Sequence, residues 1–317
     1  MRLIMVGTGP FAVPTFRELY KTRHEVVLLV TAPLRTHRGK QIAPVSRIRE
    51  IAAEHDTPIF DPENINASES RDRLAAFEAD LLVVCDYGQI LSAETLATAR
   101  LGGVNLHGAL LPKYRGAAPV NWAVYHGQRE TGVTVIHMTP KVDAGPAIAQ
   151  ASLAIEPEET APELEDRLAE LGAPLVCRTI DVLESGTVEP VPQDPALASR
   201  APRLKKTHGV VDWSRPARAI CSQIRAFQPW PGSYTFWHRA DGPAVRLILW
   251  EATPTEAADA EATPGTVLEA ADGRLVVAAG EGAVRVRRVQ PAGKREMDTR
   301  QFLRGYRVTL GDRFGPG

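Results

Sequence analysis

The chain has 317 residues, of which 44% are hydrophobic and 24% charged, a composition typical of a soluble globular protein with room for two domains. No apolar run approaches the roughly 18 residues that a membrane-spanning helix needs, and the apolar start is too short for a signal peptide. We therefore expect a cytoplasmic protein without a membrane partner. The three cysteines match no metal-ligand spacing, which argues against a disulfide framework and predicts no metal site.

The net charge of the whole chain is only −1, but the charge is unevenly distributed. Residues 200–317 carry 19 Lys and Arg against 12 Asp and Glu, a net charge of +7. A basic C-terminal third is what a phosphate-rich partner would select, although an ordinary solvated surface could carry the same excess. Composition alone leaves both interpretations open.

Strands and helices alternate along the first part of the chain. Residues 2–9 read as a buried strand ending in a glycine turn, residues 10–22 have helical spacing, and residues 24–32 read as a second strand. After a basic loop, residues 43–56 predict a helix and residues 80–86 an apolar strand. Apolar strands alternating with helices are typical of a parallel sheet covered on both faces. We therefore predict an α/β domain with a doubly wound, mostly parallel, Rossmann-like sheet.

The same domain continues through two further strands, at residues 103–110 and 131–138, and a long amphipathic helix at residues 160–186. We place this first domain at residues 1–190. Residues 191–206 are rich in Pro and Ala and lack periodicity, so we predict a linker there.

Hairpin signals dominate the second predicted domain, residues 207–317. Residues 265–293 consist of three short alternating runs broken by Ala-Asp-Gly and Gly-Glu-Gly. We therefore predict a small, mainly antiparallel β-barrel that is OB-like. Residues 251–263 lack a core pattern and are predicted to form a mobile surface loop.

The glycine turn after the first strand is similar to a dinucleotide fingerprint. Gly7 and Gly9 stand between a strand and a helix, but the third glycine and the later acidic residue of that fingerprint are missing. We therefore favour a tight strand-to-helix turn over a nucleotide site.

Three polar residues form the candidate catalytic site: Asn105, His107 and Asp143. Each alone has an ordinary structural explanation, but Asn105 and His107 alternate onto one side of a strand, at the carboxyl edge where open α/β sheets bind ligands. Asn can donate to an oxyanion, His can move a proton, and a buried Asp can orient the His and support its charge. No Ser, Cys or Lys nucleophile accompanies them. This pattern favours direct acyl transfer through a tetrahedral intermediate.

Residues 105–148 resemble the core of the folate-dependent formyltransferases, whose pattern is Asn-x-His, then Ser-Leu-Leu-Pro and Arg-Gly, followed by a loop with Asp-Ala-Gly or Asp-Thr-Gly. The resemblance implies that Asn105, His107 and Asp143 are catalytic and that 10-formyltetrahydrofolate is the co-substrate. Ala109 replaces the usual serine. The residues expected at the folate are Tyr87, Gly88, Ile90, Leu91, Ala109, Leu110, Leu111 and Pro112.

The resemblance extends to residues 203–237 and 284–308, which are similar to the members of this family that formylate methionyl-tRNA. It implies initiator methionyl-tRNA as a partner, a role in translation initiation and, we expect, a monomer. A basic loop at residues 34–41 would enter the acceptor end. The residues expected to bind tRNA are Arg35, Arg38, Lys40, Lys205, Lys206, Arg287 and Lys294, and Arg285, Arg288 and Arg295 would continue the basic track.

Other interpretations remain open. A formyltransferase acting on a small amine would share the catalytic residues but would not need the basic domain. A 10-formyltetrahydrofolate hydrolase would release formate without an acceptor. A non-catalytic RNA-binding protein would keep the charge asymmetry, and salt-sensitive tRNA binding without formyl transfer would identify it.

Overall fold

The computed structural model describes residues 1–34, 36–37, 40–41, 46–239, 242–257 and 261–316. It divides into two compact units. The first consists of Met1–Pro119, Glu130–Ala154 and Leu164–Pro202, and the second of Val120–Arg129, Ile155–Glu163 and Arg203–Gly317. The predicted domain boundaries at residues 190 and 206 stay predictions.

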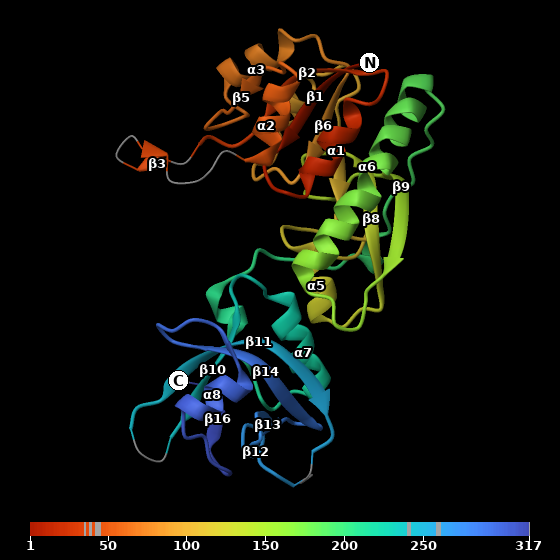
Figure 1. The fold of residues 1–317 in the computed structure, drawn as a ribbon. Helices are drawn as coiled ribbons and strands as arrows, with labels where there is room; N and C mark the ends of the chain where they lie inside the picture. The colour runs from red at the N-terminus through yellow and green to blue at the C-terminus, as the bar shows by residue number, and fades with distance from the viewer. Residues whose placement is uncertain (35, 38–39, 42–45, 240–241, 258–260, 317) are drawn as a thin grey trace. The chain divides into compact units, whose positions relative to one another are not determined.

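A twisted sheet forms the centre of the first unit, and its strands run in the order β5-β2-β1-β6-β7-β8-β9 (Figure 1). The parallel strands are β1 (Arg2–Gly7), β2 (Glu25–Val30), β5 (Ile59–Phe60), β6 (Leu81–Cys85) and β7 (Gly103–His107). The antiparallel strands are β8 (Glu130–His137) and β9 (Ala147–Ala154). The arrangement confirms the predicted mostly parallel sheet.

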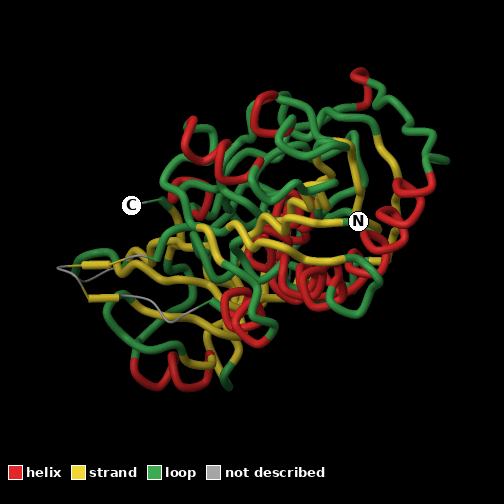
Figure 2. Tube along the Cα trace, turned by 90° about the horizontal axis from the view of Figure 1, so that it is seen from above, coloured by secondary structure: helices red, strands yellow, loops and turns green. Residues whose placement is uncertain are grey.

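Helices connect and cover these strands (Figures 1 and 2). They are α1 (Ala12–Leu19), α2 (Arg47–Glu54), α3 (Ser68–Ala75), α4 (Ala93–Leu96) and α6 (Ala161–Ser185). Helix α6 packs closely on β7 at Gly172, since an added Cβ there would lie only 2.6 Å from Leu106 Cδ2. The absence of a side chain at Gly172 allows this close approach. Between β2 and α2, the short strands β3 (Thr36–His37) and β4 (Lys40–Gln41) pair with each other.

The central strands β1 and β6 are buried along almost their whole length, which explains why their sequences are continuously apolar. At the end of β1 the chain turns tightly into α1. A Cβ on Gly7 would come within 2.8 Å of the Cys85 carbonyl oxygen, so glycine is required at this point. The observed turn agrees with the interpretation favoured from sequence.

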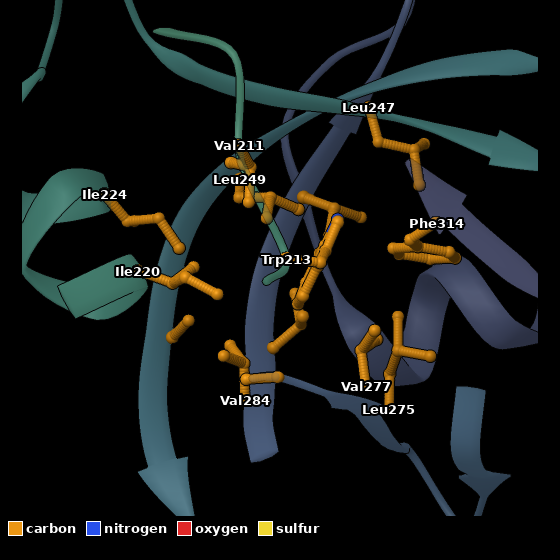
Figure 3. Close-up of a cluster of buried hydrophobic side chains, with 14 of the residues drawn as sticks. Val211, Trp213, Ile220, Ile224, Leu247, Leu249, Leu275, Val277, Val284 and Phe314 are labelled. Carbon is orange, nitrogen blue, oxygen red and sulfur yellow. The ribbon is translucent and has the colours of Figure 1, made fainter. Parts of the chain in front are cut away.

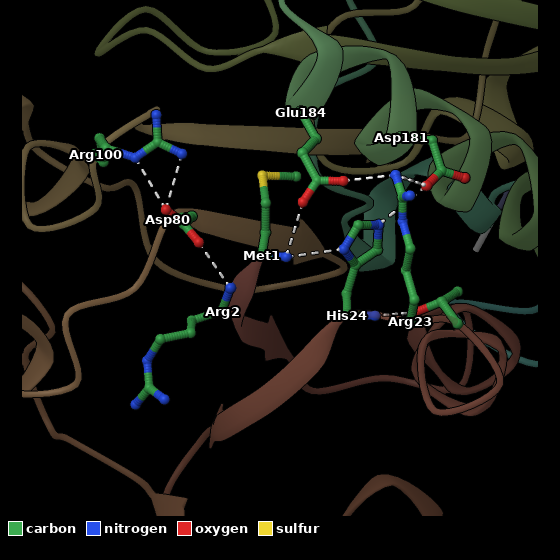
Figure 4. A network of polar contacts seen from close by, with 9 residues as sticks. Met1, Arg2, Arg23, His24, Asp80, Arg100, Asp181 and Glu184 are labelled. Carbon is green, nitrogen blue, oxygen red and sulfur yellow. Dashed lines mark hydrogen bonds and ion pairs between the residues drawn. The ribbon is translucent and has the colours of Figure 1, made fainter.

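A polar network fastens the far end of α6 to the sheet (Figure 4). The buried His24 ring lies between the Met1 amino group, 3.0 Å from Nδ1, and Asp181 Oδ1, 3.3 Å from Nε2. Arg23 contacts both Asp181 and Glu184. Ligand atoms of His24, Asp181 and Glu184 lie within 4.8 Å of one another. Since Arg23 and the Met1 ammonium already balance both carboxylates, the cluster serves as an anchor for the helix.

The second unit is built on a curled antiparallel sheet with strand order β12-β13-β14-β11-β10-β16. Its strands are β10 (Ser233–His238), β11 (Val245–Thr255), β12 (Val267–Ala271), β13 (Arg274–Ala278), β14 (Ala283–Pro291), β15 (Met297–Asp298) and β16 (Arg313–Gly315). A bridge between Thr266 and Arg313 joins the two edges of the sheet. The fold confirms the predicted antiparallel, barrel-like domain. The helices of this unit are α5 (Pro119–Tyr125), α7 (Ala217–Ala226), α8 (Thr299–Gly305) and the 3-10 turn η2 (Lys206–Gly209).

Mainly aliphatic side chains fill the interior of this sheet, together with aromatic ones such as Trp213 and Phe314 (Figure 3). Trp213 packs edge-on against Phe314, with ring centroids 5.9 Å apart, and its indole nitrogen donates to Thr235 Oγ1 at 3.0 Å. The alternating inward residues of β11, among them Leu247 and Leu249, complete the core.

The prediction of a loop at residues 251–263 is wrong for its first part. Residues 251–255 belong to β11 and pair with residues 283–288 of β14. The hydrophobic pattern of residues 251–255 is weak because most of them are exposed. Main-chain hydrogen bonds to the Val-rich strand β14 hold them in the strand instead.

Candidate active site

The structure brings the three predicted catalytic side chains together in the first unit. Asn105 and His107 point to the same side of β7, and Asp143 reaches them from the loop after β8. Asn105 Nδ2 donates to Asp143 Oδ1 at 3.5 Å, and His107 Nδ1 lies 3.6 Å from Asp143 Oδ2. The sheet edge thus gathers an amide, an imidazole and a carboxylate, as the sequence predicted.

His107 is only 5% exposed, and its ring is held at the nitrogen that does not face Asp143. Its Nε2 donates to the Tyr114 carbonyl oxygen at 2.9 Å, which places a proton on Nε2 and turns Nδ1 toward Asp143. Because 3.6 Å is too long for a good hydrogen bond, Asp143 leaves Nδ1 without a close partner of its own.

The turn at residues 114–116 supplies main-chain groups to the site. The Gly116 N–H donates to Asp143 Oδ2 at 2.9 Å, while Tyr114 supplies the carbonyl that holds His107. Gly116 has φ 126°, and a Cβ there would lie 2.5 Å from the Ala201 carbonyl oxygen. Only glycine fits this position.

The segment 109–112, expected at the folate, is fixed by two polar side chains beneath it. The buried Thr134 hydroxyl donates to the Ala109 carbonyl at 2.7 Å and accepts from the Leu111 N–H at 3.0 Å. Gln150 Nε2 donates to the Leu111 carbonyl and to the Thr134 hydroxyl. Main-chain groups carry these contacts, so they do not depend on a side chain at position 109. Ala109 and Leu111 are buried, whereas Leu110 and Pro112 are half-buried.

The second segment expected at the folate, residues 87–91, follows β6. Asn66 Nδ2 donates to the Ile90 carbonyl at 2.8 Å and so anchors the segment. Leu91 is buried, Gly88 is exposed, and Ile90 is 62% exposed. Among the described residues, the buried Tyr87 hydroxyl has no hydrogen-bond partner. Burial raises the pKa of Tyr87 to about 12, so this hydroxyl keeps its proton and can donate it to a ligand.

The predicted tRNA-binding residues come from both units, and each is described in its own unit. Arg35 and Arg38 lie outside the described residues, and Lys40 belongs to β4. In the second unit, Lys205 and Lys206 are exposed at η2. Arg287 is exposed and lies 4.0 Å from Glu251, and Arg288 contacts Glu296 at 2.9 Å. The other predicted basic residues of this unit are Lys294 and Arg295, which are exposed after β14, and Arg285, which is half-buried.

Several supporting residues were not predicted from the sequence. Tyr114 and Gly116 lie in a motif that was noted without a role for their main-chain groups, and Thr134 and Gln150 show no chemical signal in an ordinary strand pattern. Tyr114 and Gly116 hold side chains through their main-chain groups, and Thr134 and Gln150 hold a main-chain segment; residue type alone reveals neither role.

Comparisons with known proteins identify the family of the chain. Residues 1–180 match the formyl transferase family, and residues 203–307 match the formyl transferase C-terminal domain. The methionyl-tRNA formyltransferase of Rhodopirellula baltica is 44% identical over 323 residues, covering 98% of this chain and 96% of the relative. That of Pelobacter propionicus is 39% identical over 314 residues, covering 99% of this chain and 96% of the relative.

Solved structures share the fold at low sequence identity. The sugar 3N-formyl transferase WlaRD, solved in the presence of dTDP and 5-N-formyl-THF, has a TM-score of 0.65 at 16% identity, covering 93% of this chain and 99% of that one. HypX from Aquifex aeolicus in complex with tetrahydrofolic acid has a TM-score of 0.61 at 17% identity, covering 96% of this chain and 47% of that one.

Fold, site and family matches together define the class of the formyl transferases. Both family matches bear out the resemblance seen in the sequence. Within this class, the chain belongs to the family of the methionyl-tRNA formyltransferases, which it matches over nearly its whole length. In the described ranges, no helix combines the length and apolar character that crossing a membrane requires.

Proposed function

We propose that this protein transfers the formyl group of 10-formyltetrahydrofolate to the α-amine of methionine carried by initiator tRNA. The observation that carries the proposal is the convergence of Asn105, His107 and Asp143 at the sheet edge. The full-length similarity to methionyl-tRNA formyltransferases supports the choice of acceptor.

The residues present fit the folate. The Tyr87 hydroxyl, buried and without a partner among the described residues, offers a donor to a bound ring. Hydrogen bonds from Asn66 and Thr134 hold the main chain of residues 87–91 and 109–112, so each segment would offer a fixed surface to a planar ligand. When bound, the folate supplies the activated formyl carbon.

The site then performs acyl transfer in two steps. The amine attacks the formyl carbon, a C–N bond forms, and negative charge develops on the formyl oxygen. Asn105 Nδ2 and the Nδ1 N–H of a His107 ring protonated at both nitrogens would bind this oxygen. Asp143 lies beside both groups and accepts the proton that the amine loses, directly or through water. Collapse of the intermediate breaks the bond to the folate nitrogen, which leaves with a proton.

The test follows label from formyl-folate into acid-precipitable methionyl-tRNA. The variants Asn105→Ala and His107→Ala should each lose about 10²–10³-fold in kcat, the usual effect of removing one oxyanion donor. Wild-type turnover in both variants would overturn the assignment. Label appearing as formate without an acceptor would favour a hydrolase, and label entering only a small amine would favour that class instead.

We further propose that the exposed basic residues of the second unit, Lys205, Lys206, Arg287 and Lys294, bind tRNA phosphates, together with the loop that contains Arg35, Arg38 and Lys40. The enzyme would act as a monomer in the cytoplasm beside its tRNA partner. In the same assay, the KM for methionyl-tRNA should rise with salt while the KM for folate stays constant; a common rise would count against phosphate contacts.

A further inference from the structure

The segment that follows α6 is bonded to the catalytic segments, and Gln193 is the centre of this contact. Gln193 Nε2 donates to the Asp143 carbonyl at 2.9 Å and to the Gly145 carbonyl at 2.6 Å. Its Oε1 accepts from Arg115 Nη2 at 2.7 Å and from Arg115 Nε at 3.1 Å. One amide therefore uses both its donors and its acceptor on two separate loops of the site.

Residues 199–201 extend the contact along the turn at residues 114–116. The Arg115 N–H donates to the Ser199 carbonyl at 2.9 Å, and the Ala201 N–H donates to the Arg115 carbonyl at 2.7 Å. The Tyr114 N–H donates to Ser199 Oγ at 2.9 Å. We call residues 193–201 the strap. The strap thus holds the turn that grips His107 and also the loop that presents Asp143.

The held residues need such support because their main chain is unusual. Asp143 has φ 49° and Tyr114 has φ 61°, a left-handed conformation that non-glycine residues adopt at an energetic cost. Asp143 is tied at both ends, since its carbonyl accepts from Gln193 and its carboxylate accepts from Gly116. These two contacts fix the direction in which the carboxylate points.

We propose that Gln193 is a positioning residue for formyl transfer, which acts by holding Asp143 in its reactive orientation. The inference rests on the proposed role of Asp143. Gln193 itself contacts main-chain carbonyls and a guanidinium, so it affects the rate only through the groups that it holds.

The decisive variant is Gln193→Glu. It keeps the size of the side chain and an acceptor for Arg115, but replaces the two donors with an oxygen that faces the carbonyls of Asp143 and Gly145. We expect kcat to fall about 10²-fold, the typical effect of a misplaced reacting group, with both KM values within about twofold of wild type. Gln301→Glu, the same change at an exposed site on α8, is the matched control and should leave turnover unchanged.

A double-mutant cycle separates positioning from a general structural effect. In single-turnover reactions, Gln193→Glu should cost less than about twofold more when added to Asp143→Asn, because the group it positions has already been removed. An equal loss in both backgrounds would overturn the inference, and so would wild-type kcat in Gln193→Glu. If Gln193→Glu does not fold, Gln193→Met is read in the same cycle.

The two proposals fail in different ways. An inactive Asp143→Asn with a fully active Gln193→Glu would overturn the positioning role alone. Full activity of Asp143→Asn would overturn the catalytic assignment of Asp143 and the positioning role with it.

Discussion

Glu165 on α6 offers a direct test of how burial acts on stability in the first unit. Its carboxyl is half-buried. Burial raises its pKa from 4.5 to about 7, and the negative charges of Asp86 and Asp166 act in the same direction. The folded protein therefore binds a proton at this carboxyl more tightly than the unfolded chain does.

The sign of the stability effect follows from this difference. Below pH 4.5 the carboxyl is protonated in both states and costs nothing. As the pH rises from 4.5 to about 7, the carboxyl ionises in the unfolded chain before it ionises in the folded protein. The free energy of unfolding therefore decreases over this pH range. A pKa difference of one corresponds to about 1.4 kcal/mol, which sets an upper limit of about 3.5 kcal/mol for the full difference of about 2.5. Solvent around a half-buried group screens part of it, which leaves about 1–3 kcal/mol.

The variant Glu165→Gln removes the ionisation while preserving the shape. Urea unfolding should show a gain of about 1–3 kcal/mol at pH 8 and almost no gain at pH 4. Glu163→Gln is the control with the opposite sign, because hydrogen bonds from the Thr160 hydroxyl and N–H lower the pKa of Glu163. That variant should lose stability at pH 8. Equal gains of Glu165→Gln at both pH values would refute the electrostatic explanation.

Two further predictions concern the segments proposed to bind folate. Tyr87→Phe removes a buried hydroxyl that has no partner among the described residues. The Tm of the free protein should therefore rise, and the KM for formyl-folate should also rise. A lower Tm would show that the hydroxyl has a hydrogen-bond partner in the free protein. Thr134→Val removes the hydroxyl that holds Ala109 and Leu111, so the KM for formyl-folate should rise several-fold more than the KM for tRNA, and equal increases in steady-state assays would contradict this local role.

The sequence predicted the parallel part of the first sheet because its strands are buried on both faces and therefore uniformly apolar. It did not predict that β8 and β9 run antiparallel, since an apolar pattern carries no information about strand direction. The extension of β11 through residues 251–255 was missed for a related reason. Exposed strand residues need no apolar pattern when main-chain hydrogen bonds to a neighbour hold them in place.

In the candidate site, the sequence predicted the proposed catalytic groups but not the groups that hold them. Asn105, His107 and Asp143 were predicted because an amide, an imidazole and a carboxylate have chemistry that residue type alone displays. Gln193 falls in the stretch that the sequence predicted to be a linker. Its four hydrogen bonds go to the carbonyls of Asp143 and Gly145 and to the side chain of Arg115. These partners lie about 50 to 80 residues away in sequence, so no local pattern points to them. Such contacts leave no periodicity, since a single side chain makes them at a single point. A Pro-rich stretch that lacks hydrophobic periodicity can therefore still be fixed by hydrogen bonds. Here the strap contacts the left-handed main chain at Asp143, which makes the strap part of the candidate site.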